Sequence, residues 1–230
     1  MTRERACPSF WDTDWLVLRG ISRVLSQQFG QHLAKGARVI DLGCGNMPYR
    51  ATIQAAGMDY KGADIGDAAD YRIDAQGRVD LPDGSADVVL SVQVLEHVRD
   101  LDAYCAEIRR LLTKNGTLFL STHGSWLYHP HPEDHRRWTR TGLVLDLAER
   151  GLDVAEIHAV VGPLATTTMI RLSGFAFVLR RVPLLGRPLA AILSCLMNLR
   201  AVLEEVITPA AMRMDNACVY WVRATAAPAG

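Results

Sequence analysis

Short apolar runs alternate with amphipathic stretches along most of the chain. The near-continuous apolar run at 85–92 is typical of a strand that is covered on both faces. Apolar residues at helical spacing between 11 and 34 predict an amphipathic helix near the N-terminus. Further short runs of strand-forming residues predict six more strands, at 37–43, 60–65, 71–74, 117–122, 152–161 and 216–226.

Helices are predicted between several of these strands. One covers 48–56 and ends at Gly57, another begins after Asp100, and a third begins after Thr141, with Asp100 and Thr141 as N-caps. Strands that alternate with helices predict an α/β, doubly wound fold, in which a mostly parallel sheet has helices on both faces. Ligands of such sheets bind beyond the carboxyl ends of the strands.

A glycine loop follows the first of these strands. The stretch 39–50 reads VIDLGCGNMPYR, and Gly43 and Gly45 leave room for a ligand. Pro48 stands where a dinucleotide site would have its third glycine, and proline has no amide hydrogen to offer a pyrophosphate. Asp41, at the strand end, favours a cation. The loop therefore predicts a ligand with a positively charged end.

Two further acids follow the next two predicted strands. Asp64 can accept hydrogen bonds from both hydroxyls of a ribose, as acids do in nucleotide sites of this architecture. Asp74 can reach the exocyclic amine of an adenine. A ligand with adenine, ribose and a positive end near Asp41 fits S-adenosylmethionine better than it fits NAD.

Four motifs now resemble, in order and spacing, those of class I S-adenosylmethionine-dependent methyltransferases of the Rossmann-like, methyltransferase type 11-like kind. They are VIDLGCG, GADI, LPDGSADVVLSVQVLEHV and LLTKNGTLFLST. The resemblance implies a seven-stranded sheet whose last strand is antiparallel, and S-adenosyl-L-methionine as cofactor. It also implies the cofactor-binding residues, which are Asp41, Gly43, Cys44, Gly45, Asp64, Ile65, Asp74, Gln93 and His97.

The chain has 230 residues, which suits one domain. We expect a single methyltransferase domain over 1–230. Its expected parts are an N-terminal helical cap (1–36), a cofactor-binding core (37–162), an apolar and basic helical insertion (163–209), and the last strand with a tail (210–230).

Histidines cluster just after the fifth predicted strand. Methyl transfer to a hydroxyl requires removal of its proton, and we expect His123 to be the base, with His129 and His131 as alternatives. The run HPHPEDH also offers metal ligands, but H-x-H spacing has low specificity, so no metal is predicted. Glu96 and His97 are expected to stabilise the turn after the fourth strand.

The segment 163–207 contains five arginines among apolar residues and no acid before Glu204. This composition is typical of a peripheral contact with an anionic membrane surface. A lid over the site and a contact in a homodimer are the alternatives, and the sequence leaves all three open.

Composition narrows the class of function. The formal net charge is zero, so no nucleic-acid partner is expected. Five cysteines without a C-x-x-C pair suit a cytoplasmic protein, in line with the absence of a signal-like apolar segment. We expect O-methylation of a small molecule, such as a sugar or a lipid-linked precursor. The alternatives are C- or N-methylation of a quinone-like acceptor and an inactive cofactor-binding partner subunit.

Overall fold

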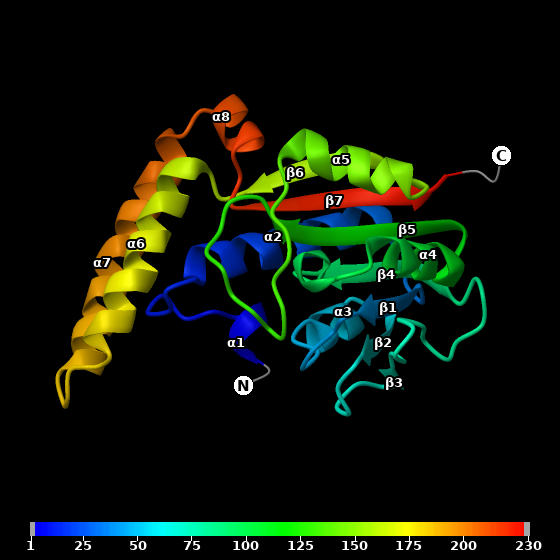
Figure 1. Cartoon of the computed structure of the whole chain (residues 1–230), viewed down its shortest axis with the longest axis horizontal. Coiled ribbons are helices and arrows are strands. Elements are labelled where there is room, and N and C mark those ends of the chain that lie inside the picture. Colours follow the sequence, from blue (N-terminus) through cyan, green and yellow to red (C-terminus); the bar gives the residue numbers. More distant parts are fainter. Residues whose placement is uncertain (1–2, 228–230) are drawn as a thin grey trace.

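The computed structural model describes residues 3–227 and has a seven-stranded sheet at its centre (Figure 1). The order of the strands is β3-β2-β1-β4-β5-β7-β6. All neighbours from β3 to β5 are parallel, whereas β7 is antiparallel to both β5 and β6. The strands are β1 (Arg38–Leu42), β2 (Asp59–Asp64), β3 (Tyr71–Arg72), β4 (Ala86–Val92), β5 (Leu112–His123), β6 (Leu152–Val160) and β7 (Val219–Ala226).

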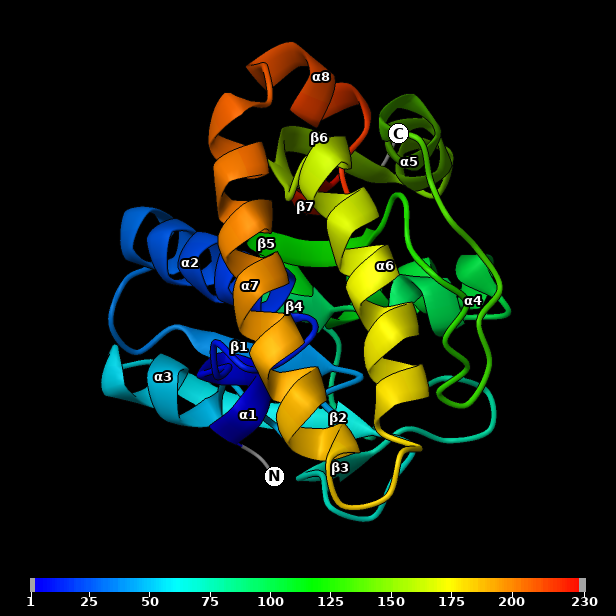
Figure 2. The same cartoon turned by 90° about the vertical axis from the view of Figure 1, so that its left-hand side faces the viewer.

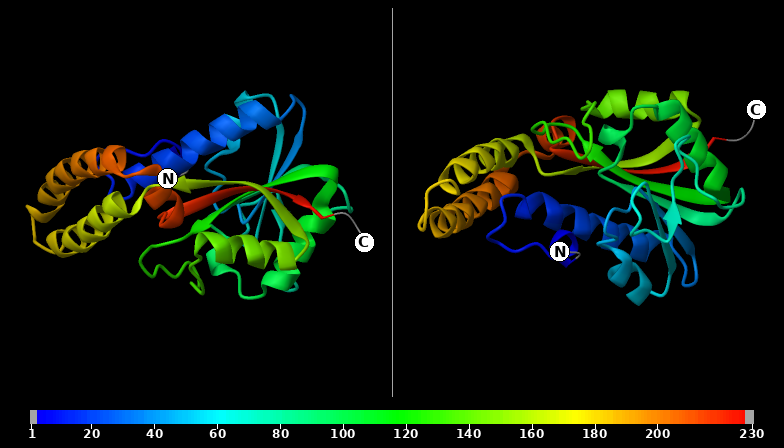
Figure 3. Two further views of the ribbon diagram at one scale, coloured as in Figure 1. Left: turned by 90° about the horizontal axis from the view of Figure 1, so that it is seen from above. Right: turned by 60° about the horizontal axis from the view of Figure 1, so that its bottom comes forward.

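Helices cover both faces of the sheet (Figure 3). One face packs against α2 and α3, and the other against α4 and α5. The predicted α/β sheet, with an antiparallel last strand and helices on both faces, is thereby confirmed. The helices are α1 (Arg3–Ala6), α2 (Trp15–His32), α3 (Arg50–Ala55), η1 (Leu95–His97), α4 (Leu101–Leu111), α5 (Arg140–Glu149), α6 (Pro163–Leu179), α7 (Gly186–Ile207) and α8 (Ala210–Asp215).

The two faces of the sheet bury separate apolar cores. Alternate residues of a strand point to opposite faces, so Val88 and Leu90 pack with α2 and α3, whereas Val89 packs with α4 and α5. This two-sided burial explains why β4 reads as a continuous apolar run. It also leaves the strand ends as the places where polar side chains can gather.

The predicted insertion before the last strand is a helical hairpin of α6 and α7. It stands across the carboxyl edge of the parallel strands (Figure 2). Its own small core contains Leu172, Ala176 and Ala190. The Asn198 side-chain amide donates to the backbone carbonyls of Phe10 and Asp12, which ties the hairpin to the N-terminal segment.

Two local expectations differ from the structure. The cap of α5 is Thr139, whose hydroxyl accepts from the Gly142 amide at 3.1 Å, rather than Thr141. Strand β5 begins at Leu112 rather than at 117, because Leu112 pairs with Ala86. The predicted tail lies outside the described residues from 228 onwards. Within residues 3–227, none of the helices has both the length and the apolar character to cross a membrane.

Candidate active site

The glycine loop leaves β1 at the carboxyl edge and turns sharply. Gly43 and Gly45 have φ angles of 84° and 51°, which glycine adopts without strain. A Cβ at Gly43 would lie 2.6 Å from a methyl group of Val94, so this glycine makes room for a side chain of the protein. A Cβ at Gly45 would meet no described atom within 4 Å. Gly45 is therefore the glycine that leaves open space for a ligand.

Asp41 is fully enclosed beneath this loop. The Tyr60 hydroxyl donates to Asp41 Oδ2 at 2.6 Å. Burial raises the pKa of Asp41 to about 7, against the lowering effect of the hydrogen bond from Tyr60. The neighbouring Cys44 thiol is buried against Gly62, and burial raises its pKa to about 12. Cys44 therefore contributes packing and backbone to the loop. A positive charge placed beside Asp41 would lower its pKa and favour the ionised carboxylate.

Asp64 lies at the end of β2 and is held by two backbone amides. Gly45 donates to Asp64 Oδ2 at 2.8 Å, and Gly66 donates to Oδ1 at 3.0 Å. Each carboxylate oxygen can accept a further hydrogen bond. The next side chain, Ile65, is 60% exposed. The β2 end thus presents a fixed carboxylate beside an exposed apolar surface.

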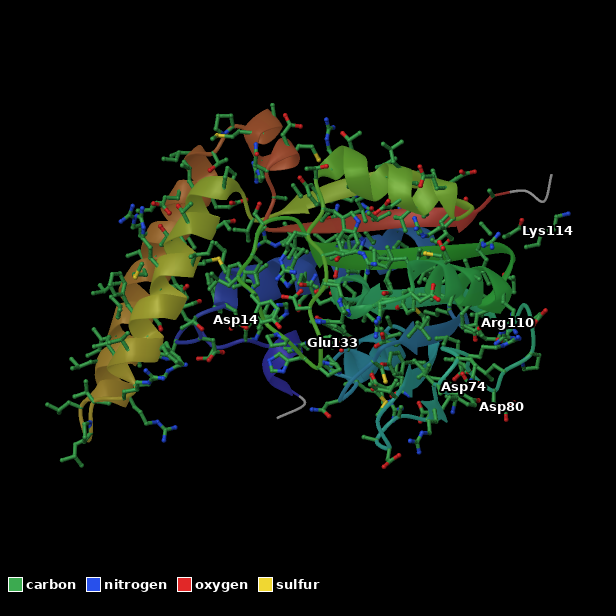
Figure 4. All side chains as sticks on the ribbon, in the orientation of Figure 1. Asp14, Asp74, Asp80, Arg110, Lys114 and Glu133 are labelled. Atoms are coloured by element: carbon green, nitrogen blue, oxygen red, sulfur yellow. The ribbon has the colours of Figure 1, made fainter. Side chains whose placement is uncertain are left out.

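Asp74 follows β3 and closes a tight turn. Its Oδ1 accepts from the backbone amides of Gln76 and Arg78. Figure 4 shows Asp74 well away from Glu133, which lies on the loop after β5. The structure therefore places Asp74 near Asp80 and Arg110, apart from the loop that carries the predicted histidines.

The turn after β4 places a carboxylate inside the protein. Gln93, at the strand end, has a φ of 57° and is held by Ser121 of β5 through its backbone and side-chain amides. Glu96 follows and has no solvent exposure. Thr122 donates to Glu96 Oε2 at 2.9 Å, whereas Oε1 has no hydrogen-bond partner among the described residues. Burial raises the pKa of Glu96 to about 7.

His123 ends β5 directly beside this carboxylate. Its Nε2 lies 3.4 Å from Glu96 Oε1, and its ring stacks on Trp126. Burial lowers the pKa of His123 to about 3, so the free imidazole is neutral near pH 7. A base with such a low pKa takes a proton from a hydroxyl poorly by itself. Removal of a proton from a hydroxyl at this site therefore requires other groups besides His123.

Two more imidazoles complete the surroundings of Glu96. The His129 ring lies 4.9 Å from that of His123 and 5.0 Å from that of His97, between ring centroids. His97 Nδ1 donates to the backbone carbonyl of Glu133, and its Nε2 lies 3.9 Å from Glu96 Oε1. The structure therefore gathers three histidines around one buried carboxylate.

The loop after β5, residues 124–139, extends from the end of the strand before it turns back to α5 (Figure 1). The amide of His135 donates to the backbone carbonyl of Glu96 at 2.8 Å. Arg137 forms a bidentate ion pair with Asp134, and Arg136 donates to the carbonyls of Val98 and Arg99. These contacts hold the loop in one position above the carboxyl edge.

The structure brings together some of the predicted residues and separates others. His123 and His129 lie in one cluster, whereas His131 is exposed, with its ring centroid 6.1 Å from that of His129. His97 belongs to the same histidine cluster. The sequence predicted only that Glu96 stabilises the turn after β4, although an acid in LEHV, directly after a strand, was an available signal for a chemical role. Trp138 is buried in the core and donates to Asp146, so it does not wall the site.

The strand order defines a Rossmann-like fold, and the open glycine and the fixed carboxylate at the end of β2 are typical of nucleotide sites in such folds. A family model described as a methyltransferase domain matches residues 16–157. Since this match covers more than half of the chain, the chain belongs to the class I S-adenosylmethionine-dependent methyltransferases. The methyl donor of this family is S-adenosyl-L-methionine.

Relatives and solved structures agree with this assignment. A probable S-adenosylmethionine-dependent methyltransferase from Mycolicibacterium smegmatis is 29% identical over 142 residues, which are 56% of this chain and 54% of that protein. A ubiquinone biosynthesis O-methyltransferase from Methylococcus capsulatus is 29% identical over 132 residues, which are 49% of this chain and 56% of that protein. The chain thus spans about half the length of the curated relatives it matches.

Among solved structures, the [4+2]-cyclase SpnF is similar, with a TM-score of 0.59 and 16% sequence identity. The likeness covers 91% of this chain and 82% of that one. At this identity, the comparison shows the shared fold alone.

The buried Asp41 makes the stability of the protein depend on pH. Its raised pKa means that the folded state holds a proton that the unfolded state releases between pH 3.8 and about 7. This contribution to stability is therefore present in acid and is lost as the pH rises through 7. We expect Asp41→Asn to be more stable than wild type by roughly 2–4 kcal/mol at pH 8, with a smaller difference at pH 5.

Urea unfolding of the cofactor-free protein at both pH values measures this difference. Asp87→Asn is the matched control, because Arg38 lowers the pKa of Asp87 by its hydrogen bond and ion pair. The contribution of Asp87 to the free energy of unfolding therefore does not change between pH 5 and pH 8. If the free energies of unfolding of Asp41→Asn and of wild type changed by the same amount between these pH values, the raised pKa of Asp41 would be contradicted.

Proposed function

We propose that this protein transfers a methyl group from S-adenosyl-L-methionine to a hydroxyl oxygen of a small, apolar acceptor. The observation that carries the proposal is the pairing of two features on one sheet edge. One is the open glycine loop with Asp64, and the other is the cluster of Glu96, His123 and His129 beyond β5. The glycine loop with Asp64 suits binding of the methyl donor. The cluster around Glu96 suits removal of a proton from the molecule that receives the methyl group.

The residues at the β1 and β2 ends fit the donor. Gly45 leaves open space, the remaining lone pairs of Asp64 suit the two ribose hydroxyls, and the exposed Ile65 offers an apolar surface to a base. Asp41 and the backbone of Gly43 and Cys44 would face the methionine part, with Asp74 toward the adenine and Gln93 and His97 beneath. When bound, the donor supplies a methyl group on a positively charged sulfur.

The chain itself must orient the acceptor and remove its proton. The cluster of Glu96, His123 and His129 lies where β4 and β5 end, next to the strand that carries the glycine loop. The stacked His123 and Trp126 rings offer a flat wall. The curated ubiquinone O-methyltransferases, to which the chain is similar over part of its length, act on oxygen. That similarity supports oxygen rather than carbon or nitrogen as the atom methylated.

Asp64→Ala should weaken binding of the donor. Losing a charged hydrogen-bond acceptor should cost about 1.5–3 kcal/mol of binding free energy. Calorimetry with S-adenosylhomocysteine measures it. Asp67→Ala, a nearby acid paired with Arg72 at the surface, is the control and should bind like wild type. Equal affinity of wild type and folded Asp64→Ala would remove Asp64 from the site.

His123→Ala should lower methyl transfer by about 10²- to 10⁴-fold while the affinity for the donor survives. Turnover of labelled donor against a panel of phenols, quinols, sugars and lipid extracts measures it. His158→Ala, on β6 beside Glu156, is the matched control and should keep wild-type turnover. Transfer to carbon or nitrogen acceptors alone would contradict the O-methyltransferase assignment, and no turnover with any acceptor would favour an inactive subunit.

The surface of the hairpin of α6 and α7 supports the proposal that the reaction takes place at a membrane surface. Side chains at helical spacing along α7 form an exposed apolar stripe, which consists of Leu189, Ile192, Leu196, Leu199 and Leu203. At the tip, Leu184 is 97% exposed. Arg180 and Arg187 line a hollow there with Trp11. We infer that the hairpin rests on an anionic membrane that holds an apolar acceptor.

Arg187→Glu should therefore weaken binding to anionic vesicles by about tenfold or more, since each basic side chain near such a surface contributes about 1 kcal/mol. Flotation at low and high salt measures binding, and salt should release the wild type. Lys114→Glu is the matched control, because Lys114 lies at the opposite end of the molecule (Figure 4). A protein that never floats but sediments as a dimer would assign the stripe to a homodimer instead.

A further inference from the structure

The cluster around Glu96 contains more unpaired polar atoms than a buried site tolerates. Glu96 Oε1, His123 Nδ1 and His129 Nδ1 are buried and have no hydrogen-bond partner in the described part of the chain. Each such atom costs about 1–3 kcal/mol when it is left without a partner. The unpaired Glu96 Oε1 lies 3.4 Å from His123 Nε2, so a component bound between these two residues would satisfy the carboxylate oxygen, although it would not reach His123 Nδ1.

The unpaired oxygen of Glu96 faces the histidines. Thr122 donates to Glu96 Oε2, which leaves Oε1 directed toward the imidazole rings. His123 Nε2 lies 3.4 Å from Oε1, and His97 Nε2 lies 3.9 Å from it. A carboxylate oxygen and imidazole nitrogens are ligands that a divalent transition-metal ion accepts.

We propose that Glu96, His123 and His129 bind a divalent transition-metal ion of the zinc class. One ligand atom from each residue lies within 4.8 Å of the others. A tetrahedral zinc ion with bonds of about 2.0–2.2 Å holds its ligand atoms about 3.4 Å apart. His123 Nε2 and Glu96 Oε1 already have this separation of 3.4 Å.

The kind and number of ligands point to a catalytic rather than a structural ion. Two imidazoles and one carboxylate suit zinc and its neighbours, whereas magnesium and calcium prefer oxygen alone. Three protein ligands leave a fourth position open. His129 comes from the loop and is partly exposed, so the open position is on the side that solvent and an acceptor can reach.

The surrounding charges are compatible with a cation. Arg137 is the positive side chain that faces the cluster, and its bidentate pair with Asp134 offsets its charge. Asp134 Oδ2 also lies 3.6 Å from His129 Nδ1. Thr122 orients the Glu96 carboxylate, as groups behind metal ligands do.

The role of the ion rests on the proposed function, whereas its binding does not. An acceptor hydroxyl in the open position loses its proton to solvent more easily, because the ion stabilises the oxygen anion. The oxygen lone pair then forms a C–O bond with the methyl carbon. The C–S bond breaks with its electron pair going to sulfur, so the charged sulfonium becomes a neutral thioether.

Titration of chelator-stripped protein with Zn²⁺ and Co²⁺ tests the site directly. We expect one ion per chain and a raised melting temperature. The protein has five free cysteines, which can also bind zinc. The Co²⁺ spectrum separates the two cases, because thiolate ligands give a strong charge-transfer band that a site of two histidines and one carboxylate lacks. Saturable binding with that band, or no saturable binding, would overturn the proposal.

His129→Ala and Glu96→Gln should each weaken Co²⁺ binding by at least about 100-fold. Glu96→Gln keeps the size of the buried side chain, and His129→Ala changes a partly exposed one, so at least one variant should fold. His135→Ala is the matched control, because His135 pairs with Glu133 outside the cluster. Equal affinity in wild type and both folded variants would place the ion elsewhere.

Methyl transfer gives the second readout. Stripped enzyme should lose transfer, and Zn²⁺ or Co²⁺ should restore it. Full activity in stripped enzyme would overturn the role of the ion even if binding occurs. If the ion binds as expected but the enzyme uses no hydroxyl acceptor, the proposed function fails while the metal site stands.

Discussion

Glu96 places a carboxylate with no solvent exposure against the last residues of β5. Taking a carboxylate out of water costs several kcal/mol unless other groups satisfy it. Thr122 and His123 of β5 lie against its oxygens, and the His135 amide binds the backbone carbonyl of the same residue. The loop after β5 must therefore fold back over the end of β4. This buried acid therefore fixes where the loop passes the end of β4, and the ion pair of Arg137 with Asp134 and the contacts of Arg136 hold the rest of the loop.

The antiparallel last strand determines where the helical hairpin stands. Strand β6 ends at the carboxyl edge, and β7 begins there, because the two strands run in opposite directions. An insertion between them must leave and re-enter the sheet at the ligand edge. At its base, Glu205 accepts from the Gly162 amide, and Glu204 accepts from Thr168. These acids lie at the base, whereas Arg180, Arg181 and Arg187 lie at the tip, so the hairpin presents a basic end away from the sheet.

The sequence predicted the sheet well because each strand is a local apolar run that needs no knowledge of its neighbours. Local patterns failed where two residues could serve equally. Thr139 and Thr141 are both good caps, and only the path of the loop decides between them. Residues 113–116 are too polar to signal a strand, yet β5 extends through them as far as Leu112, which pairs with β4. Glu96 was missed for the same reason, since its partners come from β5 and the loop beyond it.

The two halves of the ligand edge differ in how their groups are held. Asp64 and Asp74 are fixed by backbone amides, and Gly66, Gln76 and Arg78 provide several of these from nearby in the chain. Such contacts follow from short motifs, so this part of the edge, the proposed donor side, can be read from the sequence. The histidine cluster is held by side chains from separate strands and a long loop. Substitutions in that loop can change the histidine cluster without disturbing the amides that hold Asp64 and Asp74, because those amides come from residues outside the loop.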